Sequence, residues 1–261
     1  MVVIDRRPEK VASHVMDLEQ VLALSGGLAV SAGAWEELED VDVLVVCAST
    51  ALTANTSRDV YLEANIEIVD GIAERLAGWH GVVVMVTDPV DRLTARLARA
   101  LGDRRRVVGY SLNDSLRLRT SIAASLGVPA RAVEAWVLGE HGDRAVPVFS
   151  RVRVNGEPVV LTASQRAEAA DFVRNWYRRH VALDSGRSST WTSGAGVAAL
   201  VATIATGAGD PWVASTLLDG EYEIFDAAVA VPVRLGPRGV ERVLEWELAP
   251  EELEALRYAS R

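Results

Sequence analysis

The sequence predicts an α/β protein in which a doubly wound parallel sheet is followed by an α+β domain. In the first half, short β-branched runs alternate with segments of helical periodicity, a pattern typical of parallel strands joined by crossover helices. In the second half, two long helical segments precede strands with an antiparallel pattern. We therefore expect two domains, residues 1–111 and residues 112–261.

The first domain is predicted to alternate strands and helices. Apolar runs predict strands at 2–5, 41–47, 81–86 and 107–110. Apolar residues with helical spacing predict helices at 10–22, 58–76 and 90–101, and the last strand leads into a helix that contains Asp114. This order favours a parallel sheet with helices on both faces.

The second domain is predicted to mix strands and helices. Strands are expected at 133–138, 146–154, 212–218, 227–235 and 240–248, and helices at 163–181 and 188–206. Asn155-Gly156 after the second of these strands predicts a hairpin turn. Pro250, followed by Glu251 and Glu252, predicts the start of a final helix, because proline and acidic residues favour the first turn.

Composition narrows the class of protein. The 261 residues are 49% hydrophobic and 24% charged, which is ordinary for a globular enzyme. A net charge of -9, with only short arginine runs, argues against a nucleic-acid partner. The single cysteine, Cys47, excludes an internal disulfide and a cysteine-built metal site, so we expect no metal. Without a membrane-length apolar stretch or a secretory signal, we expect a cytoplasmic protein.

Two short runs carry residues suited to proton transfer and anion binding. Residues 137–143 contain His141, and residues 112–119 contain Asp114 and Arg117, which share one face of a helix. A fixed carboxylate sets the tautomer of an imidazole and stabilises its protonated form, so the pair can exchange a proton with an alcohol. The arginine fork suits a substrate carboxylate. The alternative is that His141 packs beside a turn glycine and Arg117 is a surface ion-pair partner.

These motifs resemble those of the lactate and malate dehydrogenases, and the resemblance covers the whole chain. It is carried by Gly-Glu-His-Gly-Asp at 139–143, Asp-Ser-x-Arg-x-Arg at 114–119, Asp-Pro-Val-Asp at 88–91, and Ser-Thr-Leu-Leu-Asp-Gly-Glu-Tyr at 215–222. It implies a Rossmann-type first domain, NAD as cofactor, a small 2-hydroxy or 2-keto acid as substrate, and a homodimer or homotetramer.

The resemblance implies roles for five residues at the substrate. His141 would donate and accept the proton, Asp114 would orient it, and Arg117 would bind the substrate carboxylate. Arg58 would close over the substrate and polarise its carbonyl in a water-excluded site, although it could instead be an exposed arginine at a helix start. Ser189 falls where the family places a small residue against the substrate side chain.

The resemblance also implies a set of cofactor residues. Asp5 would bind the adenosine ribose and favour NAD over NADP, because a 2′-phosphate would meet a carboxylate. Ser49 stands where the family has a glycine that approaches the cofactor. Asn65 would lie near the nicotinamide ribose, or else be an ordinary polar helix residue, and Val86 and Asp88 would lie beside the cofactor.

Two substitutions bear on the chemistry. Asp88 replaces an asparagine that donates a hydrogen bond to the substrate; an ionised aspartate only accepts and repels the substrate carboxylate, whereas protonation would restore the donor. Leu52, six residues before Arg58, stands where malate-specific members have arginine and lactate-specific members usually have glutamine. Leucine cannot pair with a second carboxylate, so a lactate-like or larger apolar side chain is favoured over malate.

The resemblance leaves one part of the first domain unmatched. Residues 2–5 correspond to the second strand of the domain, so the first strand, the G-x-G-x-x-G turn and the first helix are absent from the sequence. We expect the strand at 2–5 to lack its partner and the strand at Val43 to expose an unpaired edge. Either the start codon is mis-assigned and roughly thirty residues precede it, from the usual βαβ length, or the protein is a degenerate relative.

Three functions follow from these observations. The first is an NAD-dependent L-2-hydroxy acid dehydrogenase acting on a lactate-like or larger apolar acid. The second is a malate dehydrogenase, which Leu52 disfavours. The third is a catalytically degenerate relative that serves as a binding or structural module, which the unmatched turn, Asp88 and Ser49 favour.

Overall fold

The computed structural model describes residues 1–25, 29–50, 61–186, 189–209 and 211–261. The strands are β1 Val2–Val3, β2 Ser31–Ala32, β3 Val43–Val46, β4 Val82–Met85, β5 Val107–Gly109, β6 Val133–Glu134, β7 Val137–Gly139, β8 Ala145–Pro147, β9 Arg153–Val154, β10 Glu157–Pro158, β11 Trp212–Asp219, β12 Phe225–Gly236 and β13 Gly239–Val243. The α-helices are α1 Pro8–Ser25, α2 Leu62–Arg75, α3 Val90–Leu101, α4 Leu112–Leu126, α5 Ala163–Ala182, α6 Thr190–Thr206 and α7 Pro250–Ala259.

A mixed eight-stranded sheet runs through the middle of the chain in the order β3-β4-β5-β11-β12-β7-β8, with β13 paired to β12. Strands β3, β4 and β5 are parallel, and the four residues of β4 are all buried, as expected for a valine-rich central strand. The strands from β11 onward pair antiparallel. The predicted fold class is therefore confirmed.

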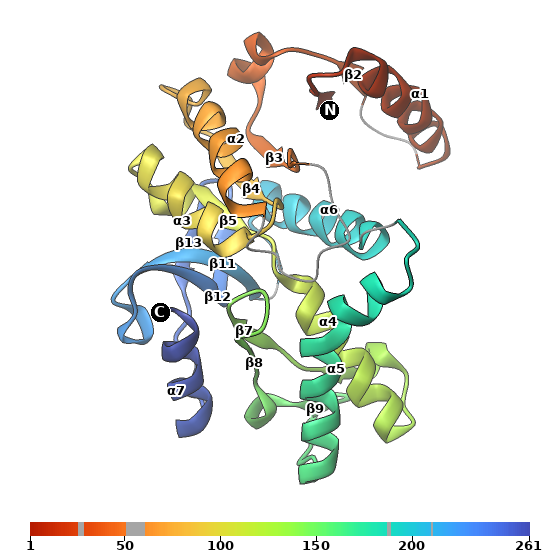
Figure 1. The fold of residues 1–261 in the computed structure, drawn as a ribbon, viewed down its shortest axis with the longest axis vertical. Coiled ribbons are helices and arrows are strands. Elements are labelled where there is room, and N and C mark those ends of the chain that lie inside the picture. The colour runs from red at the N-terminus through yellow and green to blue at the C-terminus, as the bar shows by residue number, and fades with distance from the viewer. Residues whose placement is uncertain (26–28, 51–60, 187–188, 210) are drawn as a thin grey trace.

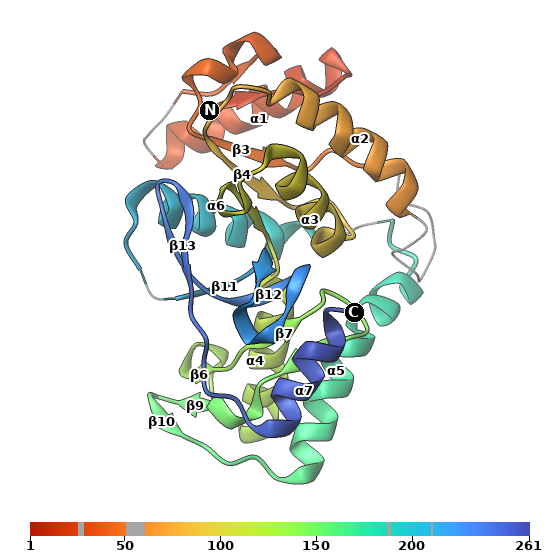
Figure 2. The same ribbon diagram turned by 90° about the vertical axis from the view of Figure 1, so that its left-hand side faces the viewer.

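The parallel and antiparallel parts of the sheet meet at one residue pair. Gly109 on β5 lies opposite Ser215 on β11, and a hydrophobic core continues across this junction from β4 and β5 to β11 and β12. In Figure 1, α1 and β2 lie at one end of the long axis, and β9 with the far end of α5 lies at the other; Figure 2 shows the same order from the side.

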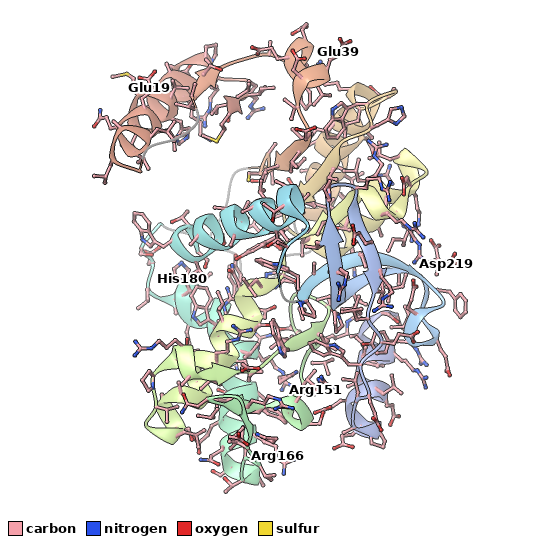
Figure 3. The ribbon with its side chains drawn as sticks, turned by 180° about the vertical axis from the view of Figure 1, so that it is seen from behind. Glu19, Glu39, Arg151, Arg166, His180 and Asp219 are labelled. Atoms are coloured by element: carbon pink, nitrogen blue, oxygen red, sulfur yellow. The ribbon has the colours of Figure 1, made fainter. Side chains whose placement is uncertain are left out.

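The expectation that the strand at 2–5 lacks a partner is wrong. β1 pairs in parallel with β2 in a separate two-stranded sheet. Helix α1 lies against this sheet, and Val11 is its one buried residue among positions 8–24; Glu19, labelled in Figure 3, lies on this helix. Within the described residues β3 pairs only with β4, so the expected free edge at Val43 is confirmed.

Helix boundaries follow local sequence signals. Helix α3 buries one face and ends at Gly102, whose φ of 67° is the left-handed conformation that glycine adopts readily. Helix α5 begins with a capping box. The backbone N–H of Gln165 donates to Thr162 Oγ1, and the backbone N–H of Thr162 donates to Gln165 Oε1. The predicted helix at 58–76 is described from Leu62 onward.

Several predicted strands are shorter than expected or divided, among them 133–138, which forms β6 and β7. The segment 146–154 divides into β8 and β9, because a 3₁₀ turn at Phe149–Arg151 interrupts it. The hairpin at Asn155-Gly156 is confirmed, with both residues at positive φ between β9 and β10. Strand β13 ends at Val243 rather than 248. No helix in the described part of the chain is long and apolar enough to cross a membrane.

Candidate active site

A cavity of about 330 Å³ lies beside His141, between α5, the start of α3, α4 and the loop that joins β7 to β8. Helix α5 contributes a single face to it, since Val173 and Tyr177 are one turn apart, as are Arg174 and Arg178. The lining holds five arginines and three carboxylates, which are Arg92, Arg117, Arg144, Arg174, Arg178, Asp114, Glu140 and Asp143, so its formal charge is positive. Such a cavity suits an anionic small molecule.

His141 lies in the loop between β7 and β8, held at its base by a glycine. Gly139 has a φ of 83°, and a Cβ added there would lie 3.0 Å from the carbonyl oxygen of Arg144. Only glycine fits this turn without strain, because both the conformation and the space exclude a side chain. The Gly139–Ala145 pair then closes the hairpin that carries the histidine.

Asp114 and Arg117 meet His141 as the sequence predicted. His141 Nδ1 lies 2.5 Å from Asp114 Oδ2, and Arg117 Nη1 lies 2.5 Å from Asp114 Oδ1. The spacing of three residues on α4 puts the aspartate and the arginine on one face. The Val137 amide donates to Ser115 Oγ at 2.9 Å, which ties β7 to α4 and sets the distance between the two motifs. An imidazole held through Nδ1 leaves Nε2 for proton transfer.

The guanidinium of Arg117 also stacks on an aromatic side chain that the sequence did not single out. Its central carbon lies 4.0 Å from the ring centroid of Trp176 on α5. Trp176 in turn stacks on His180, with centroids 4.9 Å apart and planes 11° apart; Figure 3 labels His180 on α5. The only sequence signal was an aromatic residue on an amphipathic helix, which is not specific.

A second carboxylate faces the other nitrogen of the histidine. Asp88 Oδ1 lies 3.9 Å from His141 Nε2, and the Asp88 side chain is 41% exposed. The ring therefore lies between Asp114 at Nδ1 and Asp88 at Nε2. A substrate hydroxyl that reaches Nε2 would meet the Asp88 carboxylate as well.

Asp91, a residue without an assigned role in the sequence analysis, contacts the backbone of the histidine. The His141 amide donates to Asp91 Oδ2 at 2.7 Å. Burial raises the pKa of Asp91 to about 6, against the opposing effects of Ser215 and the His141 amide. The signal was present in the Asp-Pro-Val-Asp run, where a carboxylate falls on the apolar face of a helix.

Four of the residues assigned to the cofactor, Ser49, Asn65, Val86 and Asp88, gather at the carboxyl ends of β3 and β4. Asn65 links these ends, because the Thr50 amide donates to its Oδ1 at 2.8 Å and its Nδ2 donates to the Asp88 carbonyl at 2.7 Å. Val86 pairs with Val46 through its amide, and the Ser49 hydroxyl donates to the Thr50 carbonyl. Cofactors bind at this edge of a parallel sheet, so the position of these residues fits a cofactor site.

The residue assigned to the adenosine ribose lies elsewhere in the fold. Asp5 follows β1, in the separate two-stranded sheet, and does not follow a strand of the main sheet. It accepts from the Arg7 amide and pairs with Lys10 Nζ at 3.4 Å, and these contacts hold the pKa of Asp5 below its usual value. Asp5 therefore does not lie with the other residues assigned to the cofactor, because they gather at the main sheet.

Three residues assigned to the substrate remain, which are Arg58, Leu52 and Ser189. Arg58 and Leu52 lie outside the described residues. Ser189 precedes α6, accepts from the Ser193 amide at 3.2 Å, and is not among the residues that line the cavity. In the described ranges, His, Cys, Asp and Glu side chains form no group of three or more that could hold a metal ion.

Comparison with known proteins identifies relatives over both halves. Residues 1–109 match the family model for the lactate/malate dehydrogenase NAD-binding domain, and residues 112–261 match the one for the lactate/malate dehydrogenase alpha/beta C-terminal domain. A malate dehydrogenase from Halobacterium salinarum is 35% identical over 260 residues, covering 97% of this chain and 84% of that protein. An L-lactate dehydrogenase from Mesoplasma florum is 29% identical over 266 residues, covering 98% of this chain and 84% of that protein.

The fold agrees with the sequence comparison. The structure of the malate dehydrogenase from Aeropyrum pernix superposes with a TM-score of 0.92 at 29% identity, covering 99% of this chain and 86% of that one. Proteins that carry either of the two names are thus similar to this chain in sequence and in fold. The chain belongs to the lactate/malate dehydrogenase family of NAD-dependent oxidoreductases.

Proposed function

We propose that the protein interconverts an L-2-hydroxy acid and the corresponding 2-keto acid. The observation that carries this proposal is the contact of His141 Nδ1 with Asp114 Oδ2 at 2.5 Å, beside Arg117 in one cationic cavity. When bound, NAD supplies the hydride acceptor or donor at its nicotinamide ring. His141 Nε2 takes the hydroxyl proton on oxidation and returns it on reduction, while Asp114 holds the ring and stabilises its charged form.

Arg117 would bind the substrate carboxylate, and its ion pair with Asp114 and its stacking on Trp176 support an anchored guanidinium. Arg58, which lies outside the described residues, would approach the substrate oxygen, as the family resemblance implies. A cation there stabilises the negative charge that develops on the oxygen.

The substrate side chain is proposed to be apolar, from lactate-like to larger. Leu52 supports this proposal, because it cannot pair with a second carboxylate. A malate or oxaloacetate specificity is the second candidate. It is favoured by the cavity lining, where Arg174 adds positive charge beyond Arg117, and by the malate dehydrogenases among the similar proteins.

A catalytically degenerate module is the third candidate. The Asp88 carboxylate, 3.9 Å from His141 Nε2, favours it, because an anion there opposes the substrate carboxylate. The intact contacts among His141, Asp114 and Arg117 argue against it, since a protein without turnover has no need of them.

The proposal also includes a domain boundary and an oligomeric state. A boundary between residues 111 and 112 is supported by the separate family matches to 1–109 and 112–261. Self-association as a homodimer or homotetramer follows from the family resemblance, and sedimentation of the purified chain tests it. A monomer at all concentrations would contradict it.

The deciding experiment measures NADH oxidation with pyruvate, larger apolar 2-keto acids and oxaloacetate. Turnover that is fastest on an apolar keto acid supports the Leu52 argument, and turnover fastest on oxaloacetate supports the second candidate. His141→Ala is expected to abolish turnover, whereas His80→Ala, at an exposed histidine outside the cavity, keeps it. A folded protein that turns over none of these acids would support the degenerate module.

A further inference from the structure

Asp91 is a buried carboxylate that joins two distant parts of the chain at the histidine. It lies in the first turn of α3 and is 6% exposed. Its Oδ2 accepts the His141 amide at 2.7 Å, so it links α3 to the loop between β7 and β8. The ring of the same histidine is held by Asp114 on α4. His141 is thus held at two points, by carboxylates from two different helices.

The surroundings of Asp91 do not otherwise favour a carboxylate. Its Oδ1, the Thr94 hydroxyl and the Ser215 hydroxyl are all buried without a hydrogen-bond partner of good geometry in the described residues. Gly109 lets these groups approach, since a Cβ there would lie 2.6 Å from Thr94 Oγ1 and 2.7 Å from Ser215 Cβ. Burying polar atoms without partners is unfavourable. The contact with the His141 amide is the strong hydrogen bond that Asp91 makes here.

Charged neighbours act on Asp91 in opposite directions. His141 favours its ionised form and Glu140 disfavours it, while burial outweighs both and raises the pKa of Asp91 to about 6. The carboxylate therefore lies at a site where burial disfavours its ionised form. A group retained under such conditions points to a role in the geometry of the histidine.

We propose that Asp91 is a positioning residue, whose Oδ2 fixes the backbone of His141 so that Nε2 meets the substrate hydroxyl. This proposal rests on the proposed function, because it assumes that His141 transfers the proton. Catalytic groups must be held within about 0.5 Å of the productive geometry. Asp114 holds the imidazole ring through Nδ1, whereas Asp91 holds the backbone of the same residue through its N–H.

Two variants separate the positioning role from a packing role. In Asp91→Asn the amide oxygen still accepts the His141 N–H, and the amide nitrogen can donate to Ser215. In Asp91→Ala the acceptor is lost. We expect Asp91→Ala to lower kcat about 10- to 100-fold, the effect of a small displacement of a catalytic group, with KM for the keto acid changed less than about threefold because Arg117 is untouched. Asp91→Asn should restore kcat to within about threefold of the parent.

A second measurement does not depend on turnover. Amide hydrogen exchange of His141, followed by NMR on the full chain, should accelerate about tenfold or more in Asp91→Ala and stay near the parent rate in Asp91→Asn. Thr94→Val is the matched control, because it alters the same buried cluster without touching His141. It should change neither kcat nor the exchange rate.

The proposal is overturned if Asp91→Ala leaves kcat and exchange unchanged, if Asp91→Asn is as impaired as Asp91→Ala, or if Thr94→Val has the same effect. If the parent protein turns over no keto acid, the proposed function fails. The exchange comparison then decides by itself whether Asp91 holds the histidine.

Discussion

The guanidinium of Arg117 lies 4.0 Å above the indole ring of Trp176, while its Nη1 lies 2.5 Å from Asp114 Oδ1. Stacking fixes the plane of the guanidinium and the ion pair fixes its rotation within that plane. Two neighbours on different helices thus define the orientation of the group that we propose binds the substrate carboxylate. A planar cation held in this way loses less conformational entropy on binding.

Trp176→Leu tests this arrangement. Loss of a partly buried cation–π contact of about 1 to 2 kcal/mol should raise KM for the keto acid about tenfold, with kcat changed less. Steady-state kinetics over a range of keto acid concentrations measures both. Trp35→Leu is the control, because Trp35 stacks with Arg75 at 5.3 Å and does not line the cavity. An unchanged KM in Trp176→Leu would contradict the orienting role.

Asp88→Asn is predicted to raise activity. The Asp88 carboxylate lies 3.9 Å from His141 Nε2 and would repel a substrate carboxylate. Asparagine removes the charge and adds a donor, so kcat/KM should rise about tenfold, in line with one hydrogen bond to a charged group. Asp88→Ala removes the charge without adding a donor and should give a smaller gain. A fall in kcat/KM in both variants would mean that the reaction uses the carboxylate of Asp88.

Much of the fold could be predicted because its signals are local. Helix α3 begins and ends where its apolar periodicity predicted, and the valine-rich β4 could be assigned from composition. The pairing of β1 with β2 could not be predicted, since Ser31 and Ala32 are small, exposed residues without a strand pattern. The junction of Gly109 with Ser215 depends on a contact between segments that are far apart in sequence.

The residues of the candidate site also fall into two groups, those that the sequence motifs predicted and those that they did not. His141, Asp114 and Arg117 could be proposed because they fall within short contiguous motifs. Trp176 and Asp91 were missed because what matters is which side chain they touch, and helical periodicity gives only the face on which they lie. A carboxylate on the buried face of an amphipathic helix is a usable signal, because such a group is rarely left without a partner.

Asp91 should also make stability depend on pH. Its pKa is raised from 3.8 to about 6 in the folded protein, so the folded state holds the proton more tightly than the unfolded chain. This contribution to stability is complete below pH 3.8 and is lost as the pH rises through about 6. Asp91→Asn cannot titrate. Its stability advantage over the parent should therefore be about 1 kcal/mol larger at pH 8 than at pH 5.

Urea unfolding followed by circular dichroism at the two pH values measures this difference. Thr94→Val serves as the reference, because it removes a buried hydroxyl without a hydrogen-bond partner and introduces no titrating group, so its effect should be the same at both pH values. An advantage of Asp91→Asn that does not change with pH would show that Asp91 titrates normally.

Gly109→Ala is predicted to strain the junction between the two parts of the sheet. The added Cβ would lie 2.6 Å from Thr94 Oγ1 and 2.7 Å from Ser215 Cβ, so α3 or β11 must move. We expect a loss of about 1 to 3 kcal/mol in the free energy of unfolding, as for overpacked cores. Gly194→Ala on α6 is the control, since nothing lies within 4 Å of its Cβ position, and a helix-interior alanine should stabilise by up to about 1 kcal/mol.

The double variant Gly109→Ala/Thr94→Ala locates the strain. Removing the Thr94 hydroxyl makes room for the new methyl group on the side of α3, so the two substitutions should together cost less than the sum of their separate effects. Urea unfolding of the four proteins of the cycle measures the difference. Strictly additive losses would mean that the strain is relieved at β11 through Ser215, and the β5–β11 pair would then be the weaker side of the junction.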